Sequence, residues 1–315
     1  MDTLESRIGA PDPAVRLLAV RELAEGEAAH TERLVCSALR DPDPEVRRAA
    51  VGVLGQTDLD GATRWLLAAL QDPDAEVRSA ASETLAGLNR ADRAPDLLQA
   101  LESATDAFAV ESLLRALKPL RHAPALARAR AALASDTPEV RRQAIGVLGY
   151  LGALDAFADL ARLSLTDADA GVRLTALGAL TFASAPDIAA AASAALSDPA
   201  WTVRAAAAGI LGRTKASGAS AALVGLLGDP SWQVRESAAF ALGALHAGGA
   251  LEPVGRCLQD TFSNVRKAAV LALTDIGAGA ARALLEQACA DADAQVRKLA
   301  RQALQQLGPV PPGRI

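Results

Sequence analysis

Aromatic residues and cysteine are scarce in this sequence of 315 residues, and each scarcity excludes a class of structure. Phe, Trp and Tyr make up 3% of the chain although 51% of it is hydrophobic, so a core must be built from Ala, Leu and Val. That mixture favours closely packed helices. Cys36, Cys257 and Cys289 lack CxxC spacing, which argues against a disulfide framework and against a zinc site. We expect all three thiols to be buried.

Positive charge and long apolar runs are also missing. The net charge is −5 and the isoelectric point about 5.4, so sequence-independent binding of nucleic acid lacks its main driving force. No signal peptide is recognisable at the start, and no run of 18 apolar residues occurs. These absences predict a soluble cytoplasmic protein without a membrane partner.

A repeat of about 31 residues dominates what is present. Leu recurs eight residues after a regularly spaced Val, and Ala recurs four residues after it. With the Val as position 0, positions 0, +4, +7 and +8 form one stripe on a helix. Each repeat is therefore predicted to be a helical hairpin whose second helix carries this stripe. The valines are Val15, Val46, Val77, Val110, Val140, Val172, Val203, Val234, Val265 and Val296.

The ends of the second helices are marked by the residues that favour such ends. Asp12, Asp43 and Thr137 each precede a proline, which places an N-capping side chain before a first helical residue that needs no amide donor. Glycine recurs at +9, where we expect it to close the helix in the left-handed conformation. These glycines are Gly55, Gly149, Gly212 and Gly243.

A single hairpin cannot bury both of its apolar faces, so the repeats must stack and share one core. The sequence thus predicts an all-α fold, with one solenoid of ten repeats over residues 1–307. The first ten or so residues fall outside the repeat pattern. The segment 308–315 is too rich in Pro and Gly to continue a helix.

An arginine follows the position-0 residue in most repeats, and seven of these arginines lie six residues after an aspartate. A row of guanidinium groups could bind phosphates or carboxylates, but the same residues could fasten the turns through internal ion pairs. With Val110 as position 0, the fourth repeat has Glu111 in place of the arginine and Thr105 in place of the aspartate. Joint loss of both residues favours internal pairs.

The pattern D-P-D-x-x-V-R-x-x-A-x-x-x-L resembles the short HEAT-like repeats first recognised in phycobilisome bilin lyases. The resemblance covers almost the whole chain. It implies a right-handed superhelix whose second helices line a concave, partner-binding surface. Similar arrays serve as scaffolds, adaptors and chaperones, and a few branches are enzymes. One such enzyme, deoxyhypusine hydroxylase, binds iron through His-Glu dipeptides; this chain has none, so no metal site is expected.

Positions +2, +5 and +6 of the second helices are predicted to face the concavity, and in repeats six to nine they are mostly apolar. Tryptophan recurs at −2 in two adjacent repeats, where packing between repeats competes with partner binding as its role. Glycine recurs at +6, at Gly52, Gly146, Gly178 and Gly209, where either a neighbouring helix or a ligand must approach closely. The candidate partner-binding residues are Leu174, Leu177, Phe240, Val270, Leu271, Trp201 and Trp232.

Three functions remain open. The leading hypothesis is a monomeric scaffold or adaptor that needs no cofactor and holds a helix or extended segment of another protein on the concave face. The alternative is a bilin lyase-type or cofactor-handling chaperone, which the resemblance alone suggests. A nucleic-acid-binding solenoid comes third because of the acidic balance. No catalytic constellation stands out from the repeats, so no catalytic residue is assigned.

Overall fold

The computed structural model describes residues 3–25, 28–57, 59, 61–182 and 185–307, and the regular structure among them is helical throughout. The all-α prediction is therefore confirmed. The chain forms two compact blocks, residues 1–153 and 154–315, which we call the N-terminal and C-terminal blocks. A single continuous solenoid over residues 1–307 stays a prediction. The predicted tail 308–315 lies outside the described residues.

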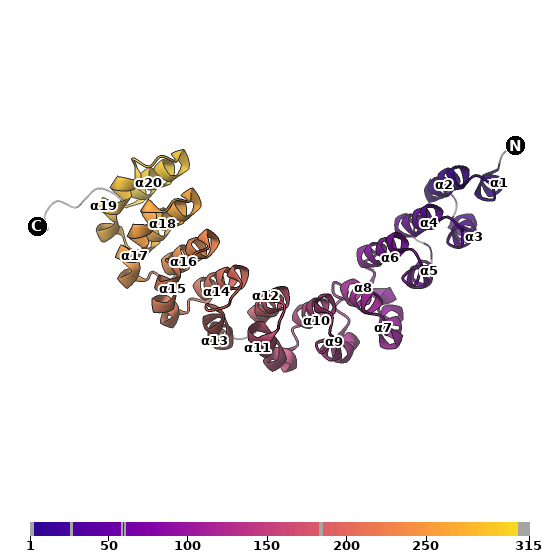
Figure 1. Ribbon diagram of the computed structural model, residues 1–315, viewed down its shortest axis with the longest axis horizontal. Coiled ribbons are helices and arrows are strands. Elements are labelled where there is room, and N and C mark those ends of the chain that lie inside the picture. The colour runs from indigo at the N-terminus through magenta and orange to yellow at the C-terminus, as the bar shows by residue number, and fades with distance from the viewer. Residues whose placement is uncertain (1–2, 26–27, 58, 60, 183–184, 308–315) are drawn as a thin grey trace, which may run out of the picture. The chain divides into compact units, whose positions relative to one another are not determined.

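The N-terminal block consists of five helical hairpins in the described residues (Figure 1). Residues 4–8, predicted to lie outside the repeat, form the first short helix, which packs against the next two long ones. The helices are α1 (Leu4–Ile8), α2 (Pro13–Glu22), α3 (Ala28–Ala38), α4 (Pro44–Gln56), α5 (Ala62–Ala69), α6 (Ala75–Gly87), α7 (Ala94–Ser103), α8 (Ala107–Leu117), α9 (Leu126–Ala132) and α10 (Pro138–Leu151).

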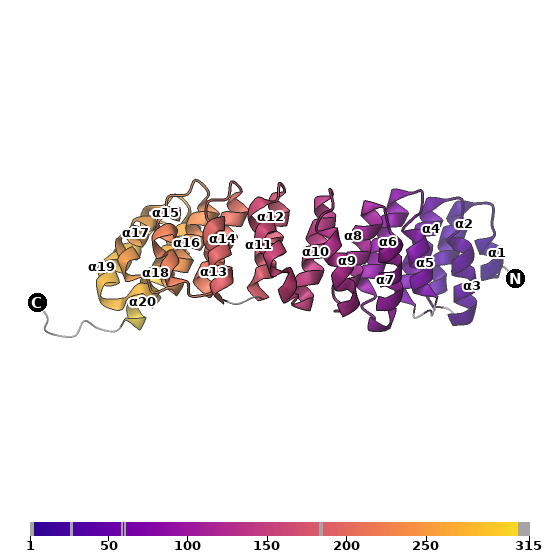
Figure 2. The same ribbon diagram turned by 90° about the horizontal axis from the view of Figure 1, so that it is seen from below.

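The C-terminal block repeats this arrangement, with its helices side by side (Figure 2). In each block the odd-numbered first helices form one row and the even-numbered second helices form the other (Figure 1). The helices are α11 (Phe157–Thr166), α12 (Ala170–Ala179), α13 (Ala185–Ala195), α14 (Trp201–Arg213), α15 (Ser220–Leu226), α16 (Trp232–Ala244), α17 (Leu251–Arg256), α18 (Ser263–Ile276), α19 (Ala278–Ala288) and α20 (Ala294–Gln306).

The second helices begin where the capping residues predict. The Asp12 carboxylate accepts the amide N–H of Ala14, and Asp43 accepts that of Glu45, so exposed donors of the first turn are satisfied. Thr137 also stands at the N-cap of its helix, but its side chain makes no capping hydrogen bond.

The buried stripe of the second helices is wider than the sequence analysis predicts. In α4 it contains positions 0, +4, +7 and +8, as expected, and also +5. A second helix packs against its own first helix and against the second helices of neighbouring repeats, so more than one face is covered. The buried residues of α4 are Val46, Ala50, Val51, Val53 and Leu54.

The glycines at +9 do not close their helices, and that prediction is wrong. Gly55, Gly212 and Gly243 lie inside α4, α14 and α16. A Cβ atom at Gly212 would lie 2.9 Å from the Cα of Ala241, and one at Gly243 only 2.7 Å from the Cα of Ala272. Glycine is needed here because neighbouring second helices approach backbone to backbone.

The left-handed closing residue stands three positions later, at +12. In α14 the amide of Ala216 donates to the Leu211 carbonyl, while Lys215 has φ 54°. This is the hydrogen bond of a Schellman motif. The positive-φ residues of the described chain share this position; they are Asn89, Arg121, Gly152, Lys215 and His246.

The fourth repeat is in register when Ala109, not Val110, is taken as position 0. Its N-cap is Asp106, which lies three residues before Ala109 just as Asp43 lies three residues before Val46. The positive-φ residue Arg121 then falls at +12. Alignment on valine places this repeat one residue too late, because Val110 is the only valine nearby. Val110 is therefore at position +1. Ala104 is at position −5, where most other repeats have an aspartate.

Arginine at +1 joins successive turns. The Nη1 of Arg204 donates to the carbonyls of Asp198 and Pro199 at 2.8 and 3.0 Å, while Nε and Nη2 donate to the Asp229 carboxylate at 2.7 and 2.9 Å. Internal pairing is thus confirmed. The rungs of this arginine–aspartate ladder are Arg16–Asp41, Arg47–Asp72, Arg173–Asp198, Arg204–Asp229, Arg235–Asp260 and Arg266–Asp291.

The ladder makes stability depend on pH. Burial by itself would raise the pKa of Asp229, but hydrogen bonds from Arg204 and from the Ser231 amide outweigh it, and the pKa lies below its usual 3.8. A carboxylate whose pKa is depressed by folding stabilises the protein above its unfolded pKa and ceases to do so as the pH falls through the folded pKa.

We expect Asp229→Asn to lower the free energy of unfolding at pH 7 by ~2–4 kcal/mol, because Arg204 keeps its buried position without a charged partner. The deficit relative to the wild type should begin to shrink as the pH falls below about 4, and it should disappear as the pH passes the depressed folded pKa, where the wild-type carboxylate is also neutralised. Urea unfolding between pH 7 and pH 2.5 measures both quantities. A deficit that is constant over this range would contradict the pairing.

Two glycine-to-alanine changes should act in opposite directions. Gly243→Ala should lower the free energy of unfolding by ~1–3 kcal/mol because its Cβ would overlap the α18 backbone. Gly52→Ala, whose Cβ meets nothing within 4 Å, should raise it by ~1 kcal/mol through helix propensity. Urea unfolding of the two variants checks the prediction, which fails if both shift alike.

Candidate functional site

The solvent-facing positions of the second helices are +2 and +6, not +5. Phe240 and Leu271 at +6 are 44% and 38% exposed, whereas Leu177 and Val270 at +5 are 0% exposed. The prediction that Leu177 and Val270 line a binding surface is therefore wrong. Position +5 is covered because the neighbouring second helices approach so closely.

The C-terminal block presents an apolar patch on this surface. Phe240 and Leu271 occupy equivalent positions on α16 and α18, which pack directly against each other. One helical turn before them stand the half-buried Glu236 and Lys267. We call these four residues the Phe240–Leu271 patch. Leu174 on α12, also predicted as a contact residue, is half-buried at the same +2 position as Glu236.

Electrostatics in the patch reflect its partly apolar surroundings. Burial raises the pKa of the Glu236 carboxyl, and the positive charge of Lys267 opposes that rise. The two side chains therefore bring one charge of each sign beside the apolar centre. This surface offers a large hydrophobic contact with charges at its margin, as the centre and rim of protein interfaces commonly do.

A second exposed feature of the C-terminal block lies at the start of the second helices. Trp232 stacks on Phe262 with ring centroids 5.7 Å apart, so packing between repeats is confirmed for this tryptophan. Trp201 is 44% exposed and has no such ring partner in the described chain. Phe262, 47% exposed, was missed by the sequence analysis because it stands one position earlier in its repeat than the tryptophans do.

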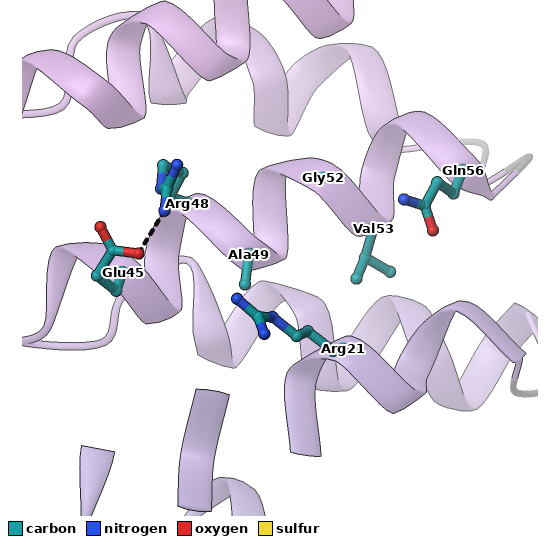
Figure 3. A pocket seen from close by; sticks show the side chains of 7 residues that line it. All are labelled: Arg21, Glu45, Arg48, Ala49, Gly52, Val53 and Gln56. Carbon is teal, nitrogen blue, oxygen red and sulfur yellow. Dashed lines mark hydrogen bonds and ion pairs between the residues drawn. The ribbon is translucent and has the colours of Figure 1, made fainter. Parts of the chain in front are cut away.

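The second-helix surface of the N-terminal block is polar instead. An open hollow of about 400 Å³ lies between α2 and α4 (Figure 3). Arg48 donates to Glu45 at its rim, and Arg21 reaches toward Ala49 from α2. Its lining residues are Arg21, Glu45, Arg48, Ala49, Gly52, Val53 and Gln56.

The glycines at +6 do not admit a neighbouring helix, so the first of the two interpretations offered for them is wrong. An added Cβ would meet nothing within 4 Å at Gly52 or Gly178, and only side-chain atoms of Arg213 at Gly209 and of Lys118 at Gly146. Gly52 and Gly178 therefore leave the second-helix surface low and accessible. The other interpretation, close approach by a ligand or partner, is left standing.

Two features of the described residues bear on catalysis and metal binding. Cys257 is buried as predicted, whereas Cys36 and Cys289 are only half-buried. Burial raises the pKa of the Cys257 thiol to about 11, which leaves it protonated and unreactive at neutral pH. Within residues 3–307, apart from the few undescribed positions, no group of three His, Cys, Asp or Glu side chains is placed to hold a metal ion.

No helix among the described residues has the length and apolar character needed to span a bilayer.

Surface and core positions of the second helices should respond differently to charge. Phe240→Asp and Leu271→Lys should change the free energy of unfolding by less than ~1 kcal/mol, because both side chains remain in water. Leu177→Asp should lower it by more than ~4 kcal/mol by burying an unpaired carboxylate. Urea unfolding decides the matter, and a small effect at Leu177 would contradict the assigned helix phase.

Known proteins share this architecture. No curated protein sequence matches the chain. Among solved structures, an engineered protein matches with a TM-score of 0.53 and 21% identity over 97% of this chain and 98% of its own. Kap95p in a complex with RanGDP gives a TM-score of 0.70 at 15% identity, covering 96% of this chain and 52% of that one. Escherichia coli YibA gives 0.59 at 18% identity, covering 85% and 97%.

These likenesses show the fold, and the chain spans only about half the length of Kap95p. The sequence profile of HEAT repeats matches residues 1–86, 31–118, 160–231 and 220–305, which together make up most of the chain. Helical hairpins of about 31 residues, fastened by an arginine–aspartate ladder, account for that match in physical terms. The protein is a member of the HEAT-repeat family.

Proposed function

We propose that this protein is a binding scaffold that holds a segment of another protein on the second helices of its C-terminal block. The observation that carries the proposal is the Phe240–Leu271 patch. Two large apolar side chains stand exposed at equivalent positions of adjacent helices, although most large apolar side chains of the described residues are buried. Exposed clusters of this kind commonly mark protein-binding sites.

The occupant we propose is a helix or extended segment with apolar side chains. Gly209 and Gly178, at the same +6 position on α14 and α12, add no side-chain bulk, so a chain could continue from Leu271 and Phe240 across a lower surface. Glu236 and Lys267 would orient it through charges at the margin. Such recognition needs no cofactor.

The structural relatives are consistent with a binding role. Kap95p binds RanGDP in one matching structure and Nup1 in another. In this chain the arginines that could have formed a row of anion ligands are largely occupied by aspartates of the ladder. The proposed binding therefore rests on the apolar patch and not on a row of anion-binding arginines.

Site-specific crosslinking tests the proposal. With p-benzoylphenylalanine in place of Phe240, irradiation in the native host should yield a covalent adduct with a partner protein. The same amino acid in place of Phe262, an equally exposed aromatic residue at the start of the second helices, is the matched control and should give at least about tenfold less of that adduct.

Binding of the purified partner then gives a second measurement. Phe240→Asp combined with Leu271→Lys should weaken binding at least about 100-fold in calorimetry, because hot-spot contacts are lost without unfolding. Phe262→Ala should change it less than about threefold. Equal binding by the double variant would refute the site.

A further inference from the structure

The fourth repeat lacks the aspartate of the ladder but keeps two arginine side chains around the position where that aspartate would stand. In an ordinary rung the aspartate lies between two guanidinium groups. Asp41 accepts two hydrogen bonds from Arg16, and its own backbone carbonyl accepts one from Arg47. Burial by itself would raise the pKa of Asp41, but the hydrogen bonds from Arg16 and the Asp43 amide, with the charges of both arginines, hold that pKa below its ordinary value.

In the fourth repeat, Ala104 stands at the position of that aspartate. The preceding arginine, Arg78, is nevertheless held like the others. Its Nη1 donates to the carbonyls of Asp72 and Pro73 at 2.7 and 3.0 Å. These contacts match those that hold Arg204, so Nε and Nη2 of Arg78 form the same donor pair. No carboxylate in the described chain pairs with it; the guanidinium carbon lies 6.0 Å from the Phe108 ring centroid.

The second guanidinium is also retained, but it comes from another helix. Position +1 of the fourth repeat is Val110, which cannot bind the Ala104 carbonyl. Arg128 on α9 replaces it, with Nη2 donating to the Ala104 carbonyl at 3.4 Å and Nε to that of Leu101 at 3.3 Å. The other repeats carry no arginine at the position of Arg128. Two guanidinium groups therefore flank residue 104 without the carboxylate that they flank elsewhere.

We propose that Arg78 and Arg128 form a binding site for a carboxylate carried by a partner protein, an aspartate or glutamate side chain. The complete rungs named above show which ligand this arginine geometry accepts, namely a carboxylate bound through Nε and Nη2. Phe108 lies beside Arg78 and would cover one side of the ligand. The site belongs to the N-terminal block and is independent of the Phe240–Leu271 patch.

Guanidinium NMR with a small probe tests this site. The probe is N-acetyl-aspartic acid amide, and the signal is the Nε–H resonance of Arg78, identified by its loss in Arg78→Lys. Arg297→Gln serves as the background, because Arg297 also lacks a carboxylate partner in the described chain. A saturable shift is expected, and Arg128→Gln should weaken binding about threefold to tenfold. Equimolar sodium chloride should give no such shift.

Ala104→Asp provides the decisive variant. It restores the missing carboxylate, so it should abolish the response to the probe, move the Arg78 signal toward those of the paired arginines and raise the melting temperature. A response that survives in this variant, or no saturable shift in the parent, would overturn the proposal. Inorganic phosphate that binds more tightly than the aspartate probe would overturn the assignment to a carboxylate.

Discussion

Each arginine of the arginine–aspartate ladder holds two turns at once, and the stacking of the repeats depends on this contact. Its Nη1 donates to two backbone carbonyls in the turn of its own hairpin, while Nε and Nη2 donate to the aspartate carboxylate of the next hairpin, as Arg204 shows. Packing among the apolar side chains of Ala, Leu and Val is non-directional, so by itself it would let one hairpin slide on the next. The planar guanidinium fork is directional, so it fixes the position of one hairpin on the next.

Close approach of the second helices is the complementary constraint. Gly212 and Gly243 let neighbouring helices meet at their backbones, whereas the first helices are farther apart. This difference curves a block toward its second helices. The glycines at +6 have the opposite surroundings, since Gly52 and Gly178 face open space. One residue type therefore serves packing at one position and accessibility at another.

The two blocks use the same architecture to present different chemistry. The C-terminal block exposes Phe240 and Leu271, which suit an apolar segment. The N-terminal block offers arginines around a polar hollow and, at the fourth repeat, a guanidinium pair without its carboxylate. Because the repeat fixes the scaffold positions, the departures from the repeat are free to carry binding specificity.

The sequence by itself determined the repeat, the all-α class, the N-caps and the pairing of arginine with aspartate, because each follows from local spacing and residue chemistry. It also placed Phe240 and Leu271 among the candidate contacts. It could not show that Leu177 and Val270 are buried, that Gly212 and Gly243 meet the next helix, or that Ala109 sets the register of the fourth repeat. Those facts depend on how closely one helix approaches another. They also depend on which distant residue reaches a given position, as Arg128 reaches the carbonyl of Ala104. Only tertiary packing decides these distances.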